Sequence, residues 1–144
     1  MSSNSRLTVA THILAWMALV ARKDPGPVTS DRIARSVNTN PVIIRRALGA
    51  LSKRGLVQSR RGAHAGWTLA KRPDAISLLD VYRAVDEGPI FALHASRTNQ
   101  ACPIGRGIQP VLTDVYDDLA GLLRRRLAGV TIEDLLNRIL RGSR

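Results

Sequence analysis

Basic and amide side chains gather around one short segment in the first third of the chain. The adjacent arginines Arg45 and Arg46 come shortly after the tripeptide Thr-Asn-Pro at 39–41. A guanidinium group carries a planar fork of N–H donors, which matches the two acceptors on the major-groove edge of guanine. These residue types at this spacing therefore predict contact with base edges. The predicted reading residues are Thr39, Asn40, Pro41, Val42, Arg45 and Arg46.

Five further basic or imidazole side chains follow along the chain. Lys53 and Arg54 stand where a helix begun at residue 41 would end, and we expect them to touch phosphates. Arg60, Arg61 and His64 come next, where we expect them to meet the DNA backbone or a narrow minor groove. Each of these residues taken alone could equally be a solvated surface charge. The cluster, rather than any single member, predicts nucleic-acid binding.

The net charge of +11 over 144 residues is confined to one half of the chain. Residues 1–72 hold 13 Lys and Arg against two acidic residues, whereas residues 73–144 hold nine of each. A generally basic protein would not show this asymmetry, which favours a polyanion-binding module joined to a neutral one. Aromatic residues make up only 3% of the chain. We therefore expect a core of Leu, Ile, Val and Ala in a mainly helical fold.

Three helices are predicted ahead of the wing residues. Apolar spacing indicates a first helix over 7–21, which the Asp-Pro-Gly-Pro sequence at 24–27 must end. Ser30 is a good cap for a short second helix reaching residue 36. Asn40 caps the third, with Pro41 in its first turn, and Gly55 follows its end. The predicted buried stripe of this third helix is Ile44, Ala47, Leu48 and Leu51.

A hairpin is predicted directly after the third helix. Residues 56–60 and 67–70 alternate in polarity as short strands do, and a glycine-rich tip at 61–66 joins them. Three helices followed by a hairpin is the order of a winged helix-turn-helix. In that arrangement the third helix enters the major groove and the hairpin, or wing, reaches the neighbouring backbone.

The second half of the sequence predicts three helices and an irregular loop. Ser77 and Asp80 form a near capping box for a helix that ends at Gly88-Pro89, and Thr131 caps the last helix. Residues 89–107 show no period and read as an irregular loop, which serves either as a sensor or as a connector. Pro110 either starts or kinks the long helix that reaches about residue 128.

Apolar residues along this long helix step by 4, 3, 4 and 3, the spacing of a coiled-coil seam. They are Ile108, Leu112, Val115, Leu119 and Leu122. We expect this seam to pair two copies of the chain, so that a homodimer meets a near-palindromic DNA site. The predicted division is a winged helix-turn-helix DNA-binding domain at 1–75 and a region at 76–144 with the effector loop and dimerisation helices.

An ordered set of segments resembles the Rrf-type transcriptional regulators, a family that includes IscR, NsrR and CymR. The matching segments are 28–34, Asn40-Pro41-Val42, Leu-Ser-Lys-Arg-Gly-Leu-Val at 51–57, 62–69 and Ile-Ser-Leu-Leu-Asp-Val at 76–81. The resemblance spans roughly residues 6–136. It implies a dimeric winged-helix repressor whose long C-terminal helix crosses to the partner subunit.

Two departures from this family pattern concern the signal and the wing. Cluster-binding members supply three cysteines before the long helix, whereas this chain has the single Cys102. We therefore expect neither a disulfide within the chain nor a metal or other cofactor, although a site shared between two subunits stays open. Cys102 is either a redox sensor near a helix N-terminus or a buried apolar residue. In the wing, Ala65 replaces a family glycine, which predicts a different tip because Ala tolerates left-handed backbone poorly.

The sequence supports other functions less well than DNA binding. An enzyme is disfavoured because the sequence shows no Ser-His-Asp or Cys-His arrangement, no phosphate-binding glycine loop and no metal motif. A winged module that binds RNA or a protein partner is the alternative. The apolar run 13–21 behind Arg6 resembles a secretory signal, but His12 and Trp16 interrupt it. We therefore expect a cytoplasmic protein with no membrane segment, responding to a small molecule or to redox state, with His94 a further candidate for an effector pocket.

Overall fold

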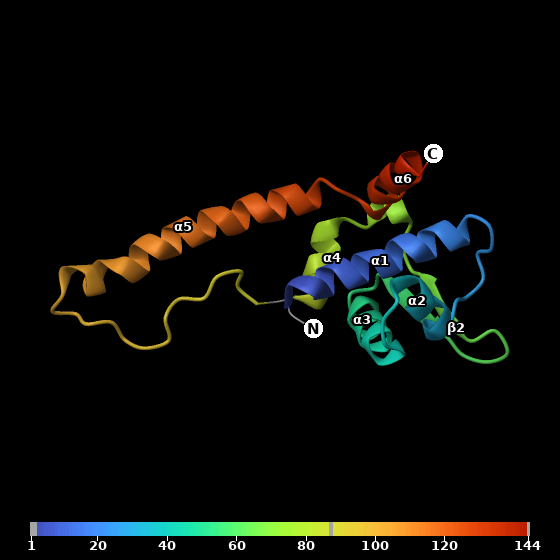
Figure 1. Cartoon of the computed structure of the whole chain (residues 1–144), viewed down its shortest axis with the longest axis horizontal. Coiled ribbons are helices and arrows are strands. Elements are labelled where there is room, and N and C mark those ends of the chain that lie inside the picture. Colours follow the sequence, from blue (N-terminus) through green and yellow to red (C-terminus); the bar gives the residue numbers. More distant parts are fainter. Residues whose placement is uncertain (1–2, 87, 144) are drawn as a thin grey trace. The chain divides into compact units, whose positions relative to one another are not determined.

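The first helices and the hairpin form in the predicted order. The computed structural model describes residues 3–86 and 88–143. The winged region comprises α1 (Ser3–Ala21), α2 (Ser30–Val37), α3 (Pro41–Lys53), β1 (Val57–Arg60) and β2 (Gly66–Leu69), as Figure 1 shows. After it come a short 3₁₀ helix, η1 (Pro73–Ala75), then α4 (Leu78–Val85), α5 (Pro103–Ala128) and α6 (Ile132–Gly142). The fold is mainly helical with a small hairpin, as predicted.

The cap of α2 differs from the prediction by one residue. Thr29, not Ser30, has the extended backbone of a cap, and its hydroxyl accepts a hydrogen bond from the Arg32 amide at 3.3 Å. The Thr29 carbonyl also accepts from the Ile33 amide at 3.2 Å. Two neighbouring hydroxyl residues compete for this role, and Ser30 instead becomes the first helical residue.

The two strands pair antiparallel from Val57–Leu69 to Arg60–Gly66. Val28, just before α2, adds an isolated bridge to Trp67 in β2, with hydrogen bonds in both directions. The wing is therefore attached to the helices on the α2 side as well as through the chain after α3.

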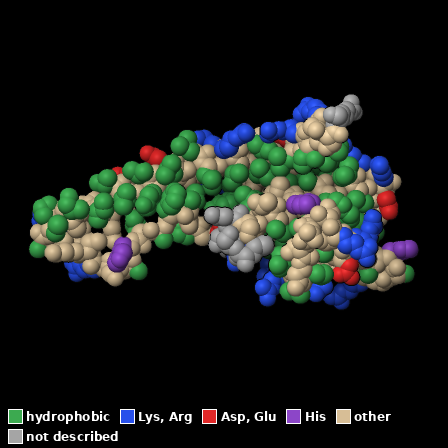
Figure 2. Space-filling model, in the orientation of Figure 1, with side chains coloured by type: hydrophobic (Ala, Val, Ile, Leu, Met, Phe, Trp, Pro, Cys, Tyr) green, Lys and Arg blue, Asp and Glu red, His purple; other side chains and the backbone are tan. Residues whose placement is uncertain are grey.

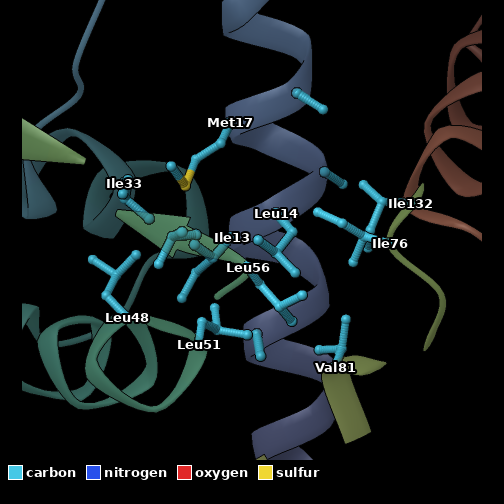
Figure 3. Packing of buried hydrophobic residues seen from close by; sticks show 14 of the residues in the cluster. Ile13, Leu14, Met17, Ile33, Leu48, Leu51, Leu56, Ile76, Val81 and Ile132 are labelled. Atoms are coloured by element: carbon cyan, nitrogen blue, oxygen red, sulfur yellow. The ribbon is translucent and has the colours of Figure 1, made fainter. Parts of the chain in front are cut away.

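The core forms around α1. Figure 3 shows Ile13, Leu14 and Met17 of this helix among side chains from α2, α3, α4 and α6 and from the segments just before β1 and α4. The most deeply buried of their core partners are Ile33, Ile44, Leu48, Leu51, Leu56, Val57, Ile76, Val81 and Ile132. No charged residue is buried among the described part of the chain. Burial of aliphatic side chains therefore supplies the stability of this region, as the composition predicted.

Helix α6 packs with α1 although it lies at the far end of the sequence. The Leu78 amide donates to the Val130 carbonyl at 2.8 Å, and the Ile132 amide donates to the Ile76 carbonyl at 2.9 Å. Arg22 adds an ion pair with Glu133 at 2.8 Å, with both side chains partly exposed. The predicted caps Ser77 and Thr131 each form a full capping box.

The chain packs as two compact units. One holds the winged helices together with α4 and the chain from Leu127 onward, and the other holds Gly88–Arg126. Packing therefore places α4 and α6 with the winged region. The division at residues 75 and 76 proposed from the sequence is a division of roles, and it stays a prediction.

In the second unit the long helix starts earlier than predicted. Helix α5 begins at Pro103, five residues before Ile108, and Pro110 lies inside it rather than at its start. The preceding loop is anchored on this helix: the Phe91 and Tyr116 rings lie 5.2 Å apart, and the Gln109 amide donates to the His94 carbonyl at 3.3 Å. No helix among the described residues is long and apolar enough to cross a membrane.

Candidate nucleic-acid interface

The turn between α2 and α3 is fixed by backbone and cap hydrogen bonds. Asn38 adopts the left-handed conformation, with φ of 57°, and its amide and that of Thr39 both donate to the Ala34 carbonyl. The Asn40 side-chain oxygen then accepts from the Val42 amide at 2.9 Å, which confirms Asn40 as the cap of α3. These bonds fix the last turn of α2 and the first turn of α3, the two helix ends that border the turn.

Three of the predicted reading residues are exposed on α3. Ile44, Leu48 and Leu51 are buried, so the opposite side of the helix faces solvent. Arg45 and Arg46 are both exposed, and Val42 is 43% exposed in the first turn. Figure 2 shows Lys and Arg side chains gathered at the edge of the winged region around α3. An exposed cationic helix face with an apolar residue at its start can offer both guanidinium donors and a contact for a thymine methyl group.

Arg45 and Arg46 point in different directions because neighbouring positions lie about 100° apart on a helix. Arg46 lines a hollow together with Arg6 and Ile43, on the side of α3 that faces the start of α1. Arg45 is not among the residues that line this hollow. The pair predicted as one unit is thus divided between two sides of α3.

The remaining predicted contacts lie at the end of α3 and on the wing. Lys53 is exposed in the last turn of α3, and Arg54 is the residue that caps this helix. Arg60 is exposed opposite Gly66, and Arg61 and His64 are exposed in the tip. The structure therefore brings exposed polar residues to both the helix and the wing, as the sequence predicted.

The wing tip accommodates Ala65 without strain. Positive φ angles occur at Gly62 and Gly66, whereas among the described non-glycine residues only Asn38 has one. Ala65 is therefore not forced into the left-handed region, and the different tip shape predicted from this residue stays a prediction.

Comparison with known proteins identifies the family. A family model described as Rrf2, iron-dependent transcriptional regulator, matches residues 3–138. The chain belongs to the Rrf2 family of transcriptional regulators. It binds DNA as a helix-turn-helix regulator and is not an enzyme.

Two relatives from Bacillus subtilis strain 168 are similar over most of the chain. YwnA, provisionally named an HTH-type transcriptional regulator, is 39% identical over 94% of this chain and 98% of its own length. The HTH-type transcriptional regulator CymR is 27% identical over 81% of this chain and 78% of its own length.

Solved structures show the same fold. A crystal structure of a provisionally named DNA-binding protein has a TM-score of 0.71 and 36% identity, over 92% of this chain and 99% of that chain. The structure of CymR of B. subtilis, named as the global cysteine regulator, has a TM-score of 0.59 and 27% identity, over 91% of this chain and 95% of that chain. IscR of T. potens has a TM-score of 0.71 and 22% identity, over 96% of this chain and 87% of that chain. This likeness supports the fold alone.

The Rrf2 family is described as iron-dependent, but the described residues of this chain offer no set of side chains that could bind iron. The described residues contain no group of three or more His, Cys, Asp or Glu side chains able to hold a metal. Cys102 is the single cysteine, so one chain cannot supply the three thiolates of a cluster. A three-thiolate cluster within one subunit does not fit this Rrf2 member.

Cys102 itself lies directly before α5 and is half-buried. Its carbonyl accepts a hydrogen bond from the Arg106 amide at 3.0 Å, as in the first turn of a helix. Cys102 thus lies near a helix N-terminus, as expected, and its intermediate burial leaves the apolar alternative a prediction. Redox sensing by Cys102 stays a prediction. His94 is exposed, and its Nδ1 accepts from the Ser96 amide at 3.1 Å.

Two basic residues that sequence reasoning passed over lie beside the predicted set. Arg35 borders a shallow depression with Asn38, Thr39 and Pro41, and Arg6 borders the hollow beside Arg46. Arg35 stands in the last turn of α2, but Thr39 lies beyond the helix end, so no helical spacing in the sequence connects the two. Nothing in the sequence connects Arg6 with Arg46, because packing of α1 on α3 brings them together.

Proposed function

We propose that this Rrf2 regulator is a homodimeric repressor that reads a near-palindromic operator through the outer face of α3. The observation that supports this best is the exposure of Val42 and Arg45 next to a turn held by the Asn40 cap. A rigidly held helix start loses little freedom on binding, so the contacts that it makes with bases contribute fully to affinity. In this proposal Arg45 pairs with guanine, and Val42 contacts a thymine methyl group.

Positioning contacts surround this reading head. Thr39 and Pro41 lie at the start of α3, and in this proposal Lys53 and Arg54 contact phosphates at its far end. Arg60, Arg61 and His64 extend the contact along the wing. Such positioning contacts add affinity on every DNA sequence and fix the register of the helix in the groove.

A second copy of the chain is the proposed partner of α5. Four of the five seam residues are at least 39% exposed, namely Ile108, Val115, Leu119 and Leu122, whereas Leu112 is half-buried. Figure 2 shows hydrophobic side chains along this helix, which Figure 1 colours orange. Apolar residues in such a continuous row are costly to leave in water, and heptad-like spacing suits pairing with an identical helix.

Repression follows from occupancy in this proposal. A dimer seated on two half-sites about one helical turn apart covers one face of the DNA across both half-sites and keeps other proteins from the same bases. An effector that lowers DNA affinity would then switch transcription on. The predicted signal is a small molecule or a redox change.

Selection of binding sites from a random duplex library by the purified protein tests this proposal. We expect an enriched site with two inverted half-sites and, when the site is placed in a promoter, less transcript in a purified transcription reaction. Duplex RNA and single-stranded RNA of the enriched sequence serve as controls. Enrichment of no sequence, tighter binding to either RNA, or increased transcript would each contradict it.

A further inference from the structure

A hollow of about 420 Å³ opens between the start of α1, one side of α3 and the end of α4. Its floor is apolar and half-buried, formed by Val9, Ile43, Ala47, Ala50 and Val85. Two exposed arginines, Arg6 and Arg46, stand at its sides. This volume lies within the range of small-molecule sites, which combine an apolar lining with a few polar groups that fix orientation.

We propose that this hollow binds a small organic anion, namely a carboxylate carried on an apolar chain or ring, and that the bound anion weakens DNA binding. The proposal rests on the proposed function, because it takes Arg46, which the sequence predicts to be a reading residue, to contact DNA. It names the class of effector and the place where that effector acts.

The charge of the lining residues selects an anion. Two guanidinium groups border the hollow, and none of its described lining residues is acidic. A carboxylate accepts hydrogen bonds from guanidinium in a bidentate geometry, and such charge-assisted bonds are roughly twice as strong as neutral ones. A neutral or cationic molecule of the same shape would forgo these bonds or be repelled.

The apolar floor separates an organic anion from a DNA phosphate. A backbone phosphate could reach Arg6 and Arg46, but it would leave five half-buried apolar side chains without a partner. An apolar chain or ring removes that surface from water, at about 25 cal/mol for each Å² buried. The observations therefore favour a ligand with both a carboxylate and an apolar part over a phosphate alone.

Arg46 supplies the coupling between this hollow and DNA. A guanidinium held by a carboxylate on the α1 side of α3 is withdrawn from DNA, so the two ligands compete for one side chain. Coupling of two binding equilibria is reciprocal, and DNA must weaken binding of the anion by the same factor.

Calorimetry on the full chain tests the site, with octanoate as the probe and octanamide as its uncharged counterpart. We expect one octanoate to bind per chain, with octanamide at least about tenfold weaker. Arg6→Gln should weaken octanoate about tenfold, and Ala50→Phe should remove binding by filling the hollow. Arg138→Gln, which changes an exposed arginine on α6, is the matched control and should leave binding unchanged.

Equal binding of octanoate and octanamide, no binding, or binding that Arg6→Gln leaves intact would overturn the site. Arg6 is exposed, so its substitution keeps the test valid even if Ala50→Phe does not fold. Operator affinity of the wild type should also fall in saturating octanoate, whereas an unchanged affinity would overturn the coupling. If the protein binds octanoate as expected but binds no DNA, the proposed function is refuted and the site stands. The two failures are therefore distinguishable.

Discussion

Val28 and Trp67 exchange two backbone hydrogen bonds, of 3.0 and 2.8 Å, which join the segment before α2 to the second strand of the wing. Gly66 lies beside this bridge with φ of 152°, and a Cβ atom built on it would lie 2.6 Å from the Val28 carbonyl oxygen. The close approach of wing and helices therefore requires a residue without a side chain at position 66.

Gly66→Ala should lower the free energy of unfolding by roughly 1–3 kcal/mol, since both the backbone angle and the contact with Val28 become strained. Urea unfolding measures this change. Gly49→Ala is the matched control: it lies inside α3 with open space around its Cβ position, and we expect a gain of about 0.5–1 kcal/mol. A Gly66→Ala protein as stable as the wild type would show that the wing tolerates a side chain there.

Thr29→Ala should cost about 1 kcal/mol of stability, because it removes the hydroxyl that caps α2. Ser30→Ala should cost much less, since Ser30 is already within the helix. Chemical unfolding of both variants distinguishes the two hydroxyls. A larger loss of stability in Ser30→Ala would instead identify Ser30 as the cap, as predicted from the sequence.

Asp134 makes the stability of the α6 cap dependent on pH. The backbone amide of Thr131, and secondly its hydroxyl, hold the pKa of this carboxyl below its usual value of 3.8. A carboxylate with a lowered pKa stabilises the fold above the unfolded pKa, and that stability is lost as the pH falls through the folded pKa. Asp134→Asn should therefore be less stable than wild type at pH 7, with a difference that shrinks below about pH 4. Urea unfolding from pH 7 to pH 3 measures it, and a difference independent of pH would refute the account.

Leu119→Arg should convert the proposed dimer to a monomer, because it buries a charge in the seam between two copies of α5. Asp117→Arg introduces the same residue outside the seam and should leave the dimer intact. Sedimentation equilibrium gives the mass of each protein. A monomeric wild type, or a dimeric Leu119→Arg, would contradict the assigned seam.

Local signals in the sequence were sufficient for most of the fold. Asn40 and Thr131 cap helices as predicted, because capping depends on residues within one turn. The choice between Thr29 and Ser30 was wrong, since adjacent hydroxyls carry nearly the same signal. The start of α5 at Pro103 was also missed, because its first turns carry two glycines and no clear apolar period.

The candidate site was predicted as a set of residues but not as a geometry. Residue type and charge pointed to Arg45 and Arg46, whereas their separation onto two sides of α3 depends on which neighbours line each side. Arg6 joins Arg46 through the packing of α1 on α3. Such long-range placement has no signature in a single sequence.

Fluorescence anisotropy with the selected operator and a shuffled duplex, measured across salt concentrations, tests the central claim most directly. We expect the wild type to prefer the operator, with affinity that falls steeply with salt because several phosphates are neutralised. Arg45→Ala should lose about 1–3 kcal/mol of preference at one base pair, whereas Lys53→Ala should weaken both duplexes alike and reduce the salt slope by about one. Equal affinity of the wild type for both duplexes, or full operator preference in Arg45→Ala, would contradict reading of bases by the outer face of α3.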